Sequence, residues 1–266
     1  MRETVVVITG ASSGIGAALA ERAARAGGRP VLAARREAEL NEVAKRCGPD
    51  ALAVVADVTR RADVQRILDQ TLARWGRVDV WVNNAGRGIT RLVSQIDDDE
   101  FDDMMRVNVK SALYGMQVVL PHFRERHRGH IINVSSVLSR MPNAPMRSAY
   151  SAAKHALNAL TANLRMELRD EPDIHVSTVL PGVVATEFGI HALGGGVDSR
   201  TLPGAQPVEE VADVILDVIR APRADVYTRP EYRQRVVDYF AADDMAAIEA
   251  QWPRIAPAPA AGGKSR

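Results

Sequence analysis

The feature that most constrains the fold is an alternation, along nearly the whole chain, of short apolar runs with longer segments of helical spacing. The apolar runs are continuous rather than interleaved with polar residues, which is typical of strands buried on both faces of a parallel sheet. Between them lie segments rich in Ala, Leu, Glu and Arg, such as Ile15–Ala26 and Glu37–Arg46. This order predicts an α/β fold with a doubly wound parallel sheet and right-handed crossovers. The predicted strands are Val5–Thr9, Pro30–Ala34, Ala51–Ala56, Val78–Val82, His130–Val134, Ile174–Leu180 and Asp225–Thr228.

The chain has 266 residues, and no break in composition divides residues 1–250, so we expect a single domain over that range. Gly194–Gly196 and the Pro203-Gly204 pair mark a loop at about 187–206, after the sixth strand. This loop is either a surface insertion or a lid over a ligand. Residues 251–266 are rich in Pro, Ala and Gly and have no apolar period, which predicts a flexible C-terminal tail.

Composition and charge exclude several classes of protein. The formal net charge of +1 gives no bulk attraction to nucleic acid or to an anionic membrane surface. No apolar stretch reaches the ~18 residues that a membrane-spanning helix needs. The single cysteine, Cys47, can form neither an intrachain disulfide nor a Cys-based metal cluster, and it fits a cytoplasmic protein. His122, His127 and His130 lack accompanying carboxylates or cysteines in a ligand pattern, so we expect no metal site.

A glycine-rich turn joins the first strand to the first helix. Its glycines are Gly10, Gly14 and Gly16, which is not the spacing of the common dinucleotide fingerprint, but the physical logic is the same. Gly10 permits a tight turn, and the other two leave room for backbone to approach a pyrophosphate. The N-terminus of the helix then offers unpaired N–H groups to phosphate oxygens. The turn therefore favours dinucleotide binding; the alternative is a glycine-rich connection without a ligand.

The end of the second strand sets the choice of dinucleotide in this kind of fold. An acidic residue there binds the ribose 2′-hydroxyl of NAD, whereas this chain has Arg35 and Arg36. Arginine suits a 2′-phosphate through charge-assisted hydrogen bonds and stacking on adenine, so we expect NADP rather than NAD. Alternatively, both arginines are solvated charges at the start of a helix. Asp57, followed by Val58 after the third strand, either accepts a hydrogen bond from the adenine amino group or caps the next helix.

Tyr150 and Lys154 are the most informative pair in the sequence. They are four residues apart in a segment predicted to be helical from Ser148 to about Arg169, so they share one helix face. A phenol is protonated at neutral pH, and a neighbouring ammonium favours the phenolate and lowers the phenol pKa. Such a tyrosine can exchange a proton with a substrate. The pair alone is equally compatible with an ordinary helix.

Polar residues also follow two of the buried strands. Ser135 and Ser136 end the fifth strand, at the carboxyl edge where doubly wound sheets bind ligands. A serine hydroxyl there can hold a substrate carbonyl oxygen, and no Gly-x-Ser-x-Gly elbow indicates a nucleophile. The stretch Asn83–Gly86 follows the fourth strand, and Asn108 lies in a helical segment.

Taken together and in order, these motifs resemble the short-chain dehydrogenase/reductase family, in its shorter-chain branch. The resemblance covers about residues 4–230. It implies a Rossmann-like, three-layer sandwich with a seven-stranded parallel sheet, and an NAD(P)-dependent oxidoreductase that interconverts a carbonyl and a secondary alcohol. It also implies a homodimer or homotetramer. The matching residues are Thr9, Gly10, Gly14, Ile15, Gly16, Asp57, Asn83, Asn84, Ala85, Gly86, Asn108, Ser136, Tyr150, Lys154 and Pro181–Thr186.

Carried over from the family, four residues have catalytic roles. Tyr150 is the general acid/base, and Lys154 lowers its pKa and binds the nicotinamide ribose. Ser136 holds the substrate oxygen, and Asn108 positions a water that links Lys154 to bulk solvent. Thr186 and the backbone of Val183 bind the nicotinamide amide. The expected cofactor-binding set is Gly10, Ser12, Ser13, Gly14, Ile15, Gly16, Arg35, Arg36, Asp57, Val58, Asn84, Ala85, Gly86, Tyr150, Lys154, Pro181, Gly182, Val183 and Thr186.

The chain departs from the family pattern at two points. Ser136 lies one residue farther from Tyr150 than is usual, so Ser135 and Ser139 are rival candidates for holding the substrate oxygen. Ser13 stands where some NADP-using members carry a Lys or Arg before the second glycine, which leaves the 2′-phosphate to Arg35 and Arg36. The alternatives to an NADP-dependent enzyme are an NAD-linked alcohol dehydrogenase and a non-catalytic NADP-binding sensor or scaffold.

Overall fold

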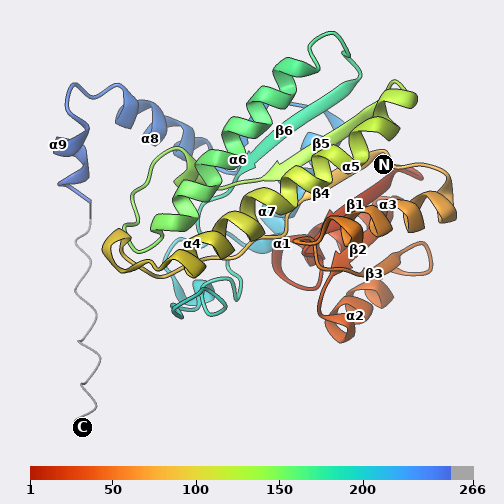
Figure 1. The fold of residues 1–266 in the computed structure, drawn as a ribbon, viewed down its shortest axis with the longest axis horizontal. Coiled ribbons are helices and arrows are strands. Elements are labelled where there is room, and N and C mark those ends of the chain that lie inside the picture. The colour runs from red at the N-terminus through yellow and green to blue at the C-terminus, as the bar shows by residue number, and fades with distance from the viewer. Residues whose placement is uncertain (253–266) are drawn as a thin grey trace.

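The computed structural model describes residues 1–252 and contains a single seven-stranded parallel sheet (Figure 1). Its strand order is β3-β2-β1-β4-β5-β6-β7, so the order reverses between β1 and β4. Each strand lies within two residues of its predicted position. The strands are β1 (Val5–Thr9), β2 (Arg29–Ala34), β3 (Leu52–Val55), β4 (Val80–Asn83), β5 (Gly129–Val134), β6 (Ile174–Leu180) and β7 (Asp225–Tyr227).

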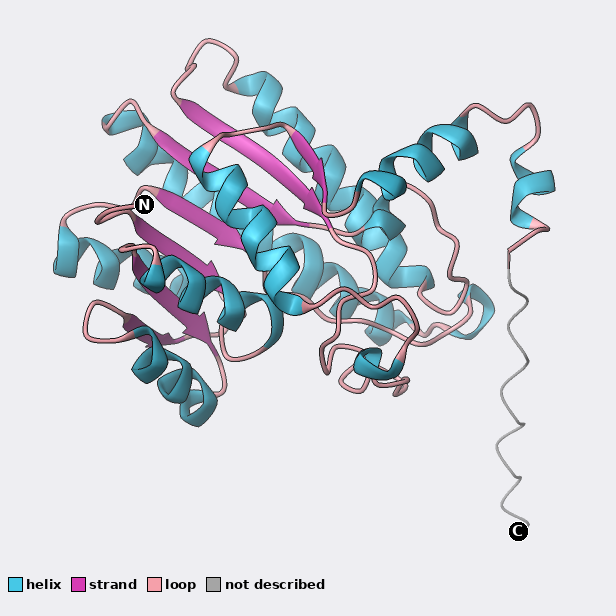
Figure 2. Cartoon of the chain, turned by 180° about the vertical axis from the view of Figure 1, so that it is seen from behind, coloured by secondary structure: helices cyan, strands magenta, loops and turns pink. Residues whose placement is uncertain are grey.

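Helices cover both faces of the sheet, which confirms the three-layer, doubly wound architecture (Figure 2). Along β1, Val6 and Ile8 pack toward α1, α2 and α7, whereas Val5 and Val7 pack toward α3 and α5. The helices are α1 (Gly14–Arg25), α2 (Glu37–Cys47), α3 (Arg61–Trp75), α4 (Asp98–Met105), α5 (Ser111–Glu125), α6 (Ser148–Glu167), α7 (Val208–Arg220), α8 (Pro230–Phe240) and α9 (Met245–Glu249).

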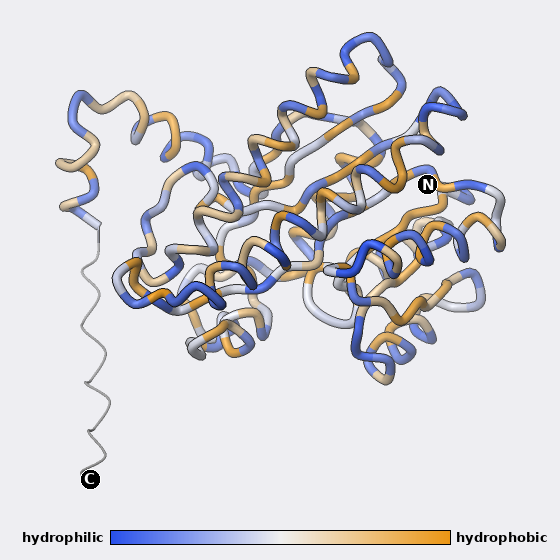
Figure 3. The backbone as a smooth tube through the Cα atoms, viewed as in Figure 1, coloured by the Kyte–Doolittle hydropathy of each residue, from blue (hydrophilic) through white to orange (hydrophobic). Residues whose placement is uncertain are grey.

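The central strands have no exposed side, as their continuous apolar sequences predict. All five residues of β1 are buried, and the apolar colour in Figure 3 follows the strands through the middle of the molecule. Burial of each such aliphatic side chain contributes roughly 1.5–3 kcal/mol. The core therefore fixes the carboxyl ends of β1, β4, β5 and β6 side by side, and this edge carries the polar residues.

The fourth strand begins later than its apolar sequence predicts, because the backbone groups of Val78 have side-chain partners. The Asp79 carboxylate accepts the backbone N–H of Val5 at 2.9 Å, and the Val78 N–H donates to the His122 ring at 3.1 Å. Arg126 also binds the Val78 carbonyl at 2.6 Å. Side chains thus take both backbone groups of Val78, whereas the Asp79 backbone still bonds to Val5 and His130 at 3.0 Å, and regular pairing begins at Val80.

The last described helices project away from the sheet (Figure 1). Most of the predicted flexible tail, residues 253–266, lies outside the described residues. Its first two residues do belong to the described part, where the Trp252 ring packs against Tyr239 with centroids 5.4 Å apart. No helix within residues 1–252 is long and apolar enough to cross a membrane.

Candidate active site

A cleft of about 1450 Å³ opens at the carboxyl edge of the sheet. It runs from the glycine-rich turn after β1, past the ends of β2 and β3, to α6 and the loop after β6. This is the crevice beside the reversal of strand order, where doubly wound sheets bind ligands. All but two of the catalytic and cofactor-binding residues predicted from the sequence line it. The exceptions are Gly16 and Asn108, which lie behind the wall.

The glycine-rich turn forms a cradle that side chains would fill. Gly10 has a φ of +67°, and a Cβ on it would lie 2.8 Å from the Ala85 Cα. Gly14 begins α1 with a φ of +57°. Ser13 occupies the N-cap position without making a capping hydrogen bond, so its side chain leaves the first N–H groups of α1 free to bind a phosphate. The turn therefore fits the pyrophosphate of a dinucleotide.

Gly16 acts behind this cradle rather than on its surface. A Cβ on Gly16 would lie 2.5 Å from the Gly10 carbonyl oxygen and 2.7 Å from Nδ2 of Asn84. The absence of a side chain thus lets α1 pack directly under the turn.

We expect Gly16→Ala to lower the free energy of unfolding by about 1–3 kcal/mol, because the backbone of the turn must move to admit the methyl group. The same movement distorts the phosphate cradle, so cofactor affinity falls as well. Chemical denaturation and fluorescence titration with the reduced cofactor measure the two effects. Wild-type values in both would show that the turn does not require this close approach.

Thr9, to which no role was assigned from the sequence, ties the turn to the end of β4. Its hydroxyl accepts the backbone N–H groups of Asn84 and Ala85 at 3.0 and 3.1 Å and donates to the Val82 carbonyl at 3.3 Å. Nδ2 of Asn84 returns a bond to the Thr9 carbonyl at 2.8 Å. Asn84 therefore acts as a brace between the two loops. The signal for this role was a hydroxyl residue at the last position of an otherwise apolar strand.

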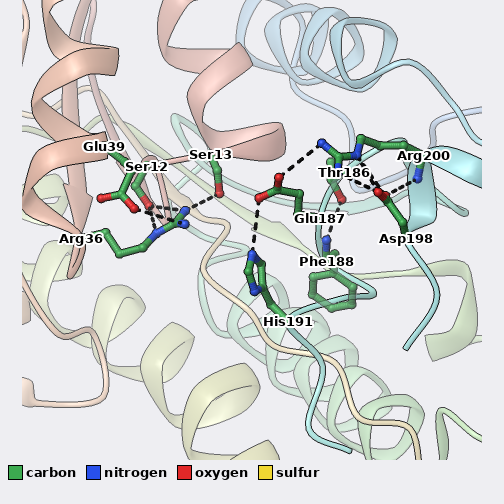
Figure 4. Close-up of polar contacts among 10 residues, drawn as sticks. All are labelled: Ser12, Ser13, Arg36, Glu39, Thr186, Glu187, Phe188, His191, Asp198 and Arg200. Carbon is green, nitrogen blue, oxygen red and sulfur yellow. Dashed lines mark hydrogen bonds and ion pairs between the residues drawn. The ribbon is translucent and has the colours of Figure 1, made fainter. Parts of the chain in front are cut away.

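The two arginines after β2 behave differently. Arg36 crosses to the glycine-rich turn, where NH2 donates to the Ser13 hydroxyl at 2.7 Å and to the Ser12 hydroxyl at 3.1 Å (Figure 4). It also pairs with Glu39 at 3.6 Å. Arg35 is exposed, lines the cleft and forms no ion pair within residues 1–252. The guanidinium of Arg35 thus stands free of ion pairs beside the glycine-rich turn, and Arg36 braces that turn.

Asp57 does not cap a helix, which excludes one of the two roles predicted for this residue. Its carboxylate accepts the N–H and the hydroxyl of Thr59 at 3.0 and 2.8 Å. Helix α3 begins at Arg61, with Arg60 as its N-cap residue. Asp57 instead stiffens the loop at this end of the cleft, and its own N–H is held by Asp63 at 2.8 Å.

Tyr150 and Lys154 lie on the first turns of α6 and are 8% and 3% exposed. Nζ of Lys154 donates to the Val134 carbonyl at the end of β5 at 2.9 Å and lies 5.7 Å from the centroid of the Tyr150 ring. Burial lowers the pKa of Lys154 to about 8, which leaves the amine mostly protonated at neutral pH.

The pKa of Tyr150 differs from the sequence-based expectation. Burial raises it to about 12, while the polar Ser136 side chain and the charge of Arg147 act in the opposite direction. Lys154, which was expected to lower this pKa, is not among its causes. The phenol is therefore protonated at neutral pH in this structure, which is the form that donates a proton.

The three candidate serines have different partners. Ser136 lines the cleft and lies close enough to the phenol to lower the pKa of Tyr150, and its hydroxyl accepts the Leu138 N–H at 3.1 Å. Ser135 also lines the cleft, but its hydroxyl is directed at the Lys154 backbone carbonyl at 3.5 Å. Ser139 does not line the cleft; its hydroxyl donates to the Ser136 carbonyl and accepts from Asn158 at 2.6 Å. Of the three, only Ser136 faces the phenol.

Asn108 lies in a π-helical turn, Arg106–Lys110, between α4 and α5. Its amide bonds to the backbone of Arg87, at 3.1 Å from the N–H and 3.0 Å to the carbonyl, and to the Met104 carbonyl at 3.1 Å. The side chain therefore fastens the loop after β4, and the expected role of Asn108 in positioning a water stays a prediction. Gly86 separates it from the lysine, since a Cβ on Gly86 would lie 3.0 Å from Oδ1 of Asn108 and 3.6 Å from Nζ of Lys154.

Two further residues lie beside the phenol. Phe188 packs edge-on against the Tyr150 ring with centroids 5.5 Å apart. Arg147 lines the cleft one helical turn before Tyr150. Arg147 was not predicted from the sequence as part of the site, because its position depends on tertiary packing and a loop arginine carries no motif.

The segment after β6 lines one side of the cleft. Within it, the Glu187 carboxylate pairs with Arg200 at 3.2 Å and contacts the His191 ring at 3.4 Å (Figure 4). Arg200 also pairs with Asp198 at 2.7 Å. Leu193 forms a bridge with Ile89 in the loop after β4, so the segment contacts the opposite wall.

Comparisons with known proteins agree with this geometry. The model of the family described as short chain dehydrogenase matches residues 4–192. An uncharacterized oxidoreductase of Staphylococcus epidermidis is 36% identical over 186 residues, which cover 70% of this chain and 80% of the relative.

Solved structures give the same result over most of the chain. A short chain dehydrogenase/reductase from Burkholderia phymatum in complex with NAD superposes with a TM-score of 0.82 at 26% identity, covering 97% of this chain and 98% of that one. An alcohol dehydrogenase from Thermococcus sibiricus complexed with 5-hydroxy-NADP superposes with a TM-score of 0.76 at 28% identity, covering 87% and 98%. With the motifs, the fold and the cleft in agreement, the chain is an NAD(P)-dependent oxidoreductase and belongs to the short-chain dehydrogenase/reductase family.

Proposed function

We propose that this protein reduces a carbonyl group to a secondary alcohol, and catalyses the reverse reaction, with NADP(H) as its cofactor. The observation that carries the reaction type is the buried phenol of Tyr150, which stands beside Ser136 on the wall of a cleft that fits a dinucleotide. A non-catalytic sensor needs the glycine-rich cradle to bind the cofactor. It needs neither a proton donor nor a hydroxyl that holds a substrate oxygen.

Each polar residue of this cluster has a distinct task in the proposed reaction. The bound nicotinamide supplies or accepts the hydride. Tyr150 donates its proton to the substrate oxygen in the reducing direction, and Ser136 holds that oxygen by a hydrogen bond. Lys154, fastened to the end of β5, keeps a positive charge beside the phenol at neutral pH and is in position to bind ribose hydroxyls. Asn108 acts as a positioning residue that holds the loop after β4.

A screen of ketones, aldehydes and secondary alcohols with both cofactors tests this function. We expect NADPH absorbance to fall with at least one carbonyl, and the matching alcohol to be oxidised with NADP. Tight cofactor binding without any turnover across the screen would instead favour the sensor.

The charge at the adenosine end of the cleft supports NADP over NAD. Arg35 is exposed, lines the cleft and has no carboxylate partner within residues 1–252, so its guanidinium is available to a 2′-phosphate. No acidic residue stands at the end of β2, where a ribose 2′-hydroxyl would need one. Arg36 is the second candidate, although its bonds to Ser12 and Ser13 give it a bracing role as well.

We expect Arg35→Ala to reduce the preference for NADPH over NADH by about 10- to 150-fold, because a charge-assisted bond to the 2′-phosphate is worth roughly 1.5–3 kcal/mol. The ratio of kcat/KM values for the two cofactors measures it. Arg46→Ala is the matched control, since Arg46 is an exposed arginine near the far end of α2 that pairs with Glu21 at 2.8 Å. If neither Arg35→Ala nor Arg36→Ala changes the ratio, the 2′-phosphate is bound elsewhere or is not selected.

We also propose that the chain forms a homodimer or homotetramer through its exposed apolar side chains. Phe101 on α4 and Met166 on α6 are 43% and 62% exposed. Light scattering after size exclusion gives the mass in solution, and a monomer at micromolar concentration would contradict this part of the proposal.

A further inference from the structure

Arg147 places a guanidinium in the wall of the cleft at the catalytic end. Its backbone is the N-cap of α6, and its side chain donates from NH1 to the Ile89 carbonyl at 3.2 Å. A Cβ on Gly88 would lie 3.1 Å from the same nitrogen and 2.8 Å from the Phe188 ring. The cation is thus held against the loop after β4, and the charge of Arg147 acts on the Tyr150 phenol.

Arg147 differs from the other arginines of the cleft in its surroundings. Arginines line this cleft at eight positions: Arg35, Arg36, Arg60, Arg87, Arg106, Arg147, Arg229 and Arg235. Four of them pair with carboxylates, in the bonds Arg36–Glu39, Arg87–Asp103, Arg106–Asp103 and Arg229–Glu210. Among the remaining four, which form no ion pair within residues 1–252, Arg147 is the one that is partly buried.

A partly buried charge without a counter-ion is unfavourable, because it loses hydration that nothing replaces. Burial accordingly lowers the pKa of Arg147 below its usual value. The neutral carbonyl of Ile89 satisfies only part of the guanidinium, which has five N–H donors in a planar fork. A carboxylate matches that fork with two parallel hydrogen bonds and supplies the missing charge.

We propose that Arg147 binds a carboxylate of the substrate, so that the enzyme acts on oxo acids and hydroxy acids in preference to neutral ketones and alcohols. This inference rests on the proposed function and names the substrate class. The carboxylate itself is unchanged in the reaction; it orients the substrate so that its carbonyl oxygen reaches Tyr150 and Ser136. Phe188, which touches the Tyr150 ring, offers an apolar surface to the rest of the molecule.

The test compares 2-, 3- and 4-oxopentanoate with their methyl esters, which keep the carbonyl and remove the negative charge. In the wild type we expect kcat/KM for the best acid to exceed that for its ester by about 10- to 150-fold, the range for a hydrogen bond to a charged group. Arg147→Met should abolish most of this ratio, and Arg147→Lys should restore part of it. Because the charge of Arg147 also acts on Tyr150, the variant lowers turnover of acid and ester alike, and that common effect cancels in the ratio.

Binding provides a second readout that does not depend on turnover. We expect the corresponding hydroxypentanoate to raise the Tm of the wild-type protein in the presence of oxidised cofactor and to leave the Tm of Arg147→Met unchanged. Cofactor titration of the variant confirms that it is folded. Arg140→Met is the matched control, since Arg140 is nearby but pairs with Asp225 at 2.8 Å and does not line the cleft.

The outcomes separate this inference from the proposed function. Equal kcat/KM values for acids and esters, or loss of the acid preference in Arg235→Met rather than in Arg147→Met, would overturn the assignment of Arg147 while leaving the oxidoreductase in place. Absence of turnover with every carbonyl, acid or ester, would instead count against the proposed function.

Discussion

Tyr150→Phe lowers kcat/KM for carbonyl reduction by about 10²- to 10⁴-fold, the usual contribution of a positioned general acid, while cofactor affinity stays close to that of the wild type. The substitution removes one oxygen and leaves the ring, which is 8% exposed and packs edge-on against Phe188. The cavity that results is smaller than a methyl group, so the packing around α6 is kept. The loss of kcat/KM therefore reflects the missing proton donor and not a change in the fold.

The protonation state of Tyr150 also determines how the rates of oxidation and reduction change with pH. With a pKa raised to about 12 by burial, the phenol is protonated throughout the neutral range and is ready to donate. Oxidation of the alcohol needs the phenolate, so we expect the rate of oxidation to rise with pH well above neutrality, whereas reduction does not need such a rise. Tyr150→Phe should remove this dependence along with the rate.

The matched control is Tyr114→Phe. Tyr114 is a partly buried tyrosine on α5 whose ring lies 4.4 Å from the Arg61 guanidinium carbon, and it does not line the cleft. We expect it to retain wild-type kinetics. Steady-state kinetics with NADPH and fluorescence titration of the cofactor measure both properties. If Tyr150→Phe were as active as the wild type, a different group would be the proton donor.

The strands of this fold were predictable because their physical signal is local. A strand buried on both faces needs a run of apolar residues, and all five residues of β1 are buried. Boundaries failed where side chains compete with the ladder. Asp79 takes the N–H of Val5 with its carboxylate, which the apolar run of Val78–Val82 gives no reason to expect.

The site was predictable to the extent that it depends on residues at strand ends. Ser136, Asn84 and the glycine-rich turn reach the cleft because parallel strands end at one edge. Arg147 was not predicted, because its role depends on the loop after β4, which brings the Ile89 carbonyl to it from 58 residues away. The bonds of Asn108 to the backbone of Arg87 were not predicted either, because they depend on the path of that same loop.

The protonation states of the site were the least predictable property. Spacing alone shows that Tyr150 and Lys154 share a helix face, and from this a lowered phenol pKa was expected. In the folded chain both groups are buried, so loss of hydration dominates. It raises the pKa of Tyr150 and lowers the pKa of Lys154, which favours the neutral form of each side chain. The degree of burial depends on the layers around α6 and cannot be read from residue spacing.

Buried Lys154 leads to the second large effect, which concerns stability. Its pKa is about 8 in the folded protein, against 10.5 for the free side chain, so the unfolded chain binds the proton more tightly. Between these values the unfolded state carries more protons than the folded state, and the free energy of unfolding rises with pH. We expect wild type to gain on the order of 2–3 kcal/mol relative to Lys154→Met between about pH 8 and pH 10.

The comparison must stay below pH 10, because Tyr150 acts in the opposite direction above it. The pKa of Tyr150 is raised from 10.0 to about 12, so its contribution to stability is complete below pH 10 and is lost as the pH rises toward 12. Urea denaturation at a series of pH values, for wild type and Lys154→Met in parallel, isolates the lysine. Lys110→Met, at an exposed position in the π-helical turn, serves as the control and should follow the wild-type curve.

Parallel pH curves for wild type and Lys154→Met would mean that the ammonium group keeps its hydration in the folded protein and that the cleft admits water to it. A rise confined to the wild type would instead mean that, at neutral pH, the fold holds a charge that its surroundings disfavour. Among the described residues 1–252, Nζ of Lys154 has one acceptor, the Val134 carbonyl, for its three protons. The remaining two are then available to ribose hydroxyls of the cofactor, so the same desolvation that destabilises the folded protein without its ligand favours cofactor binding.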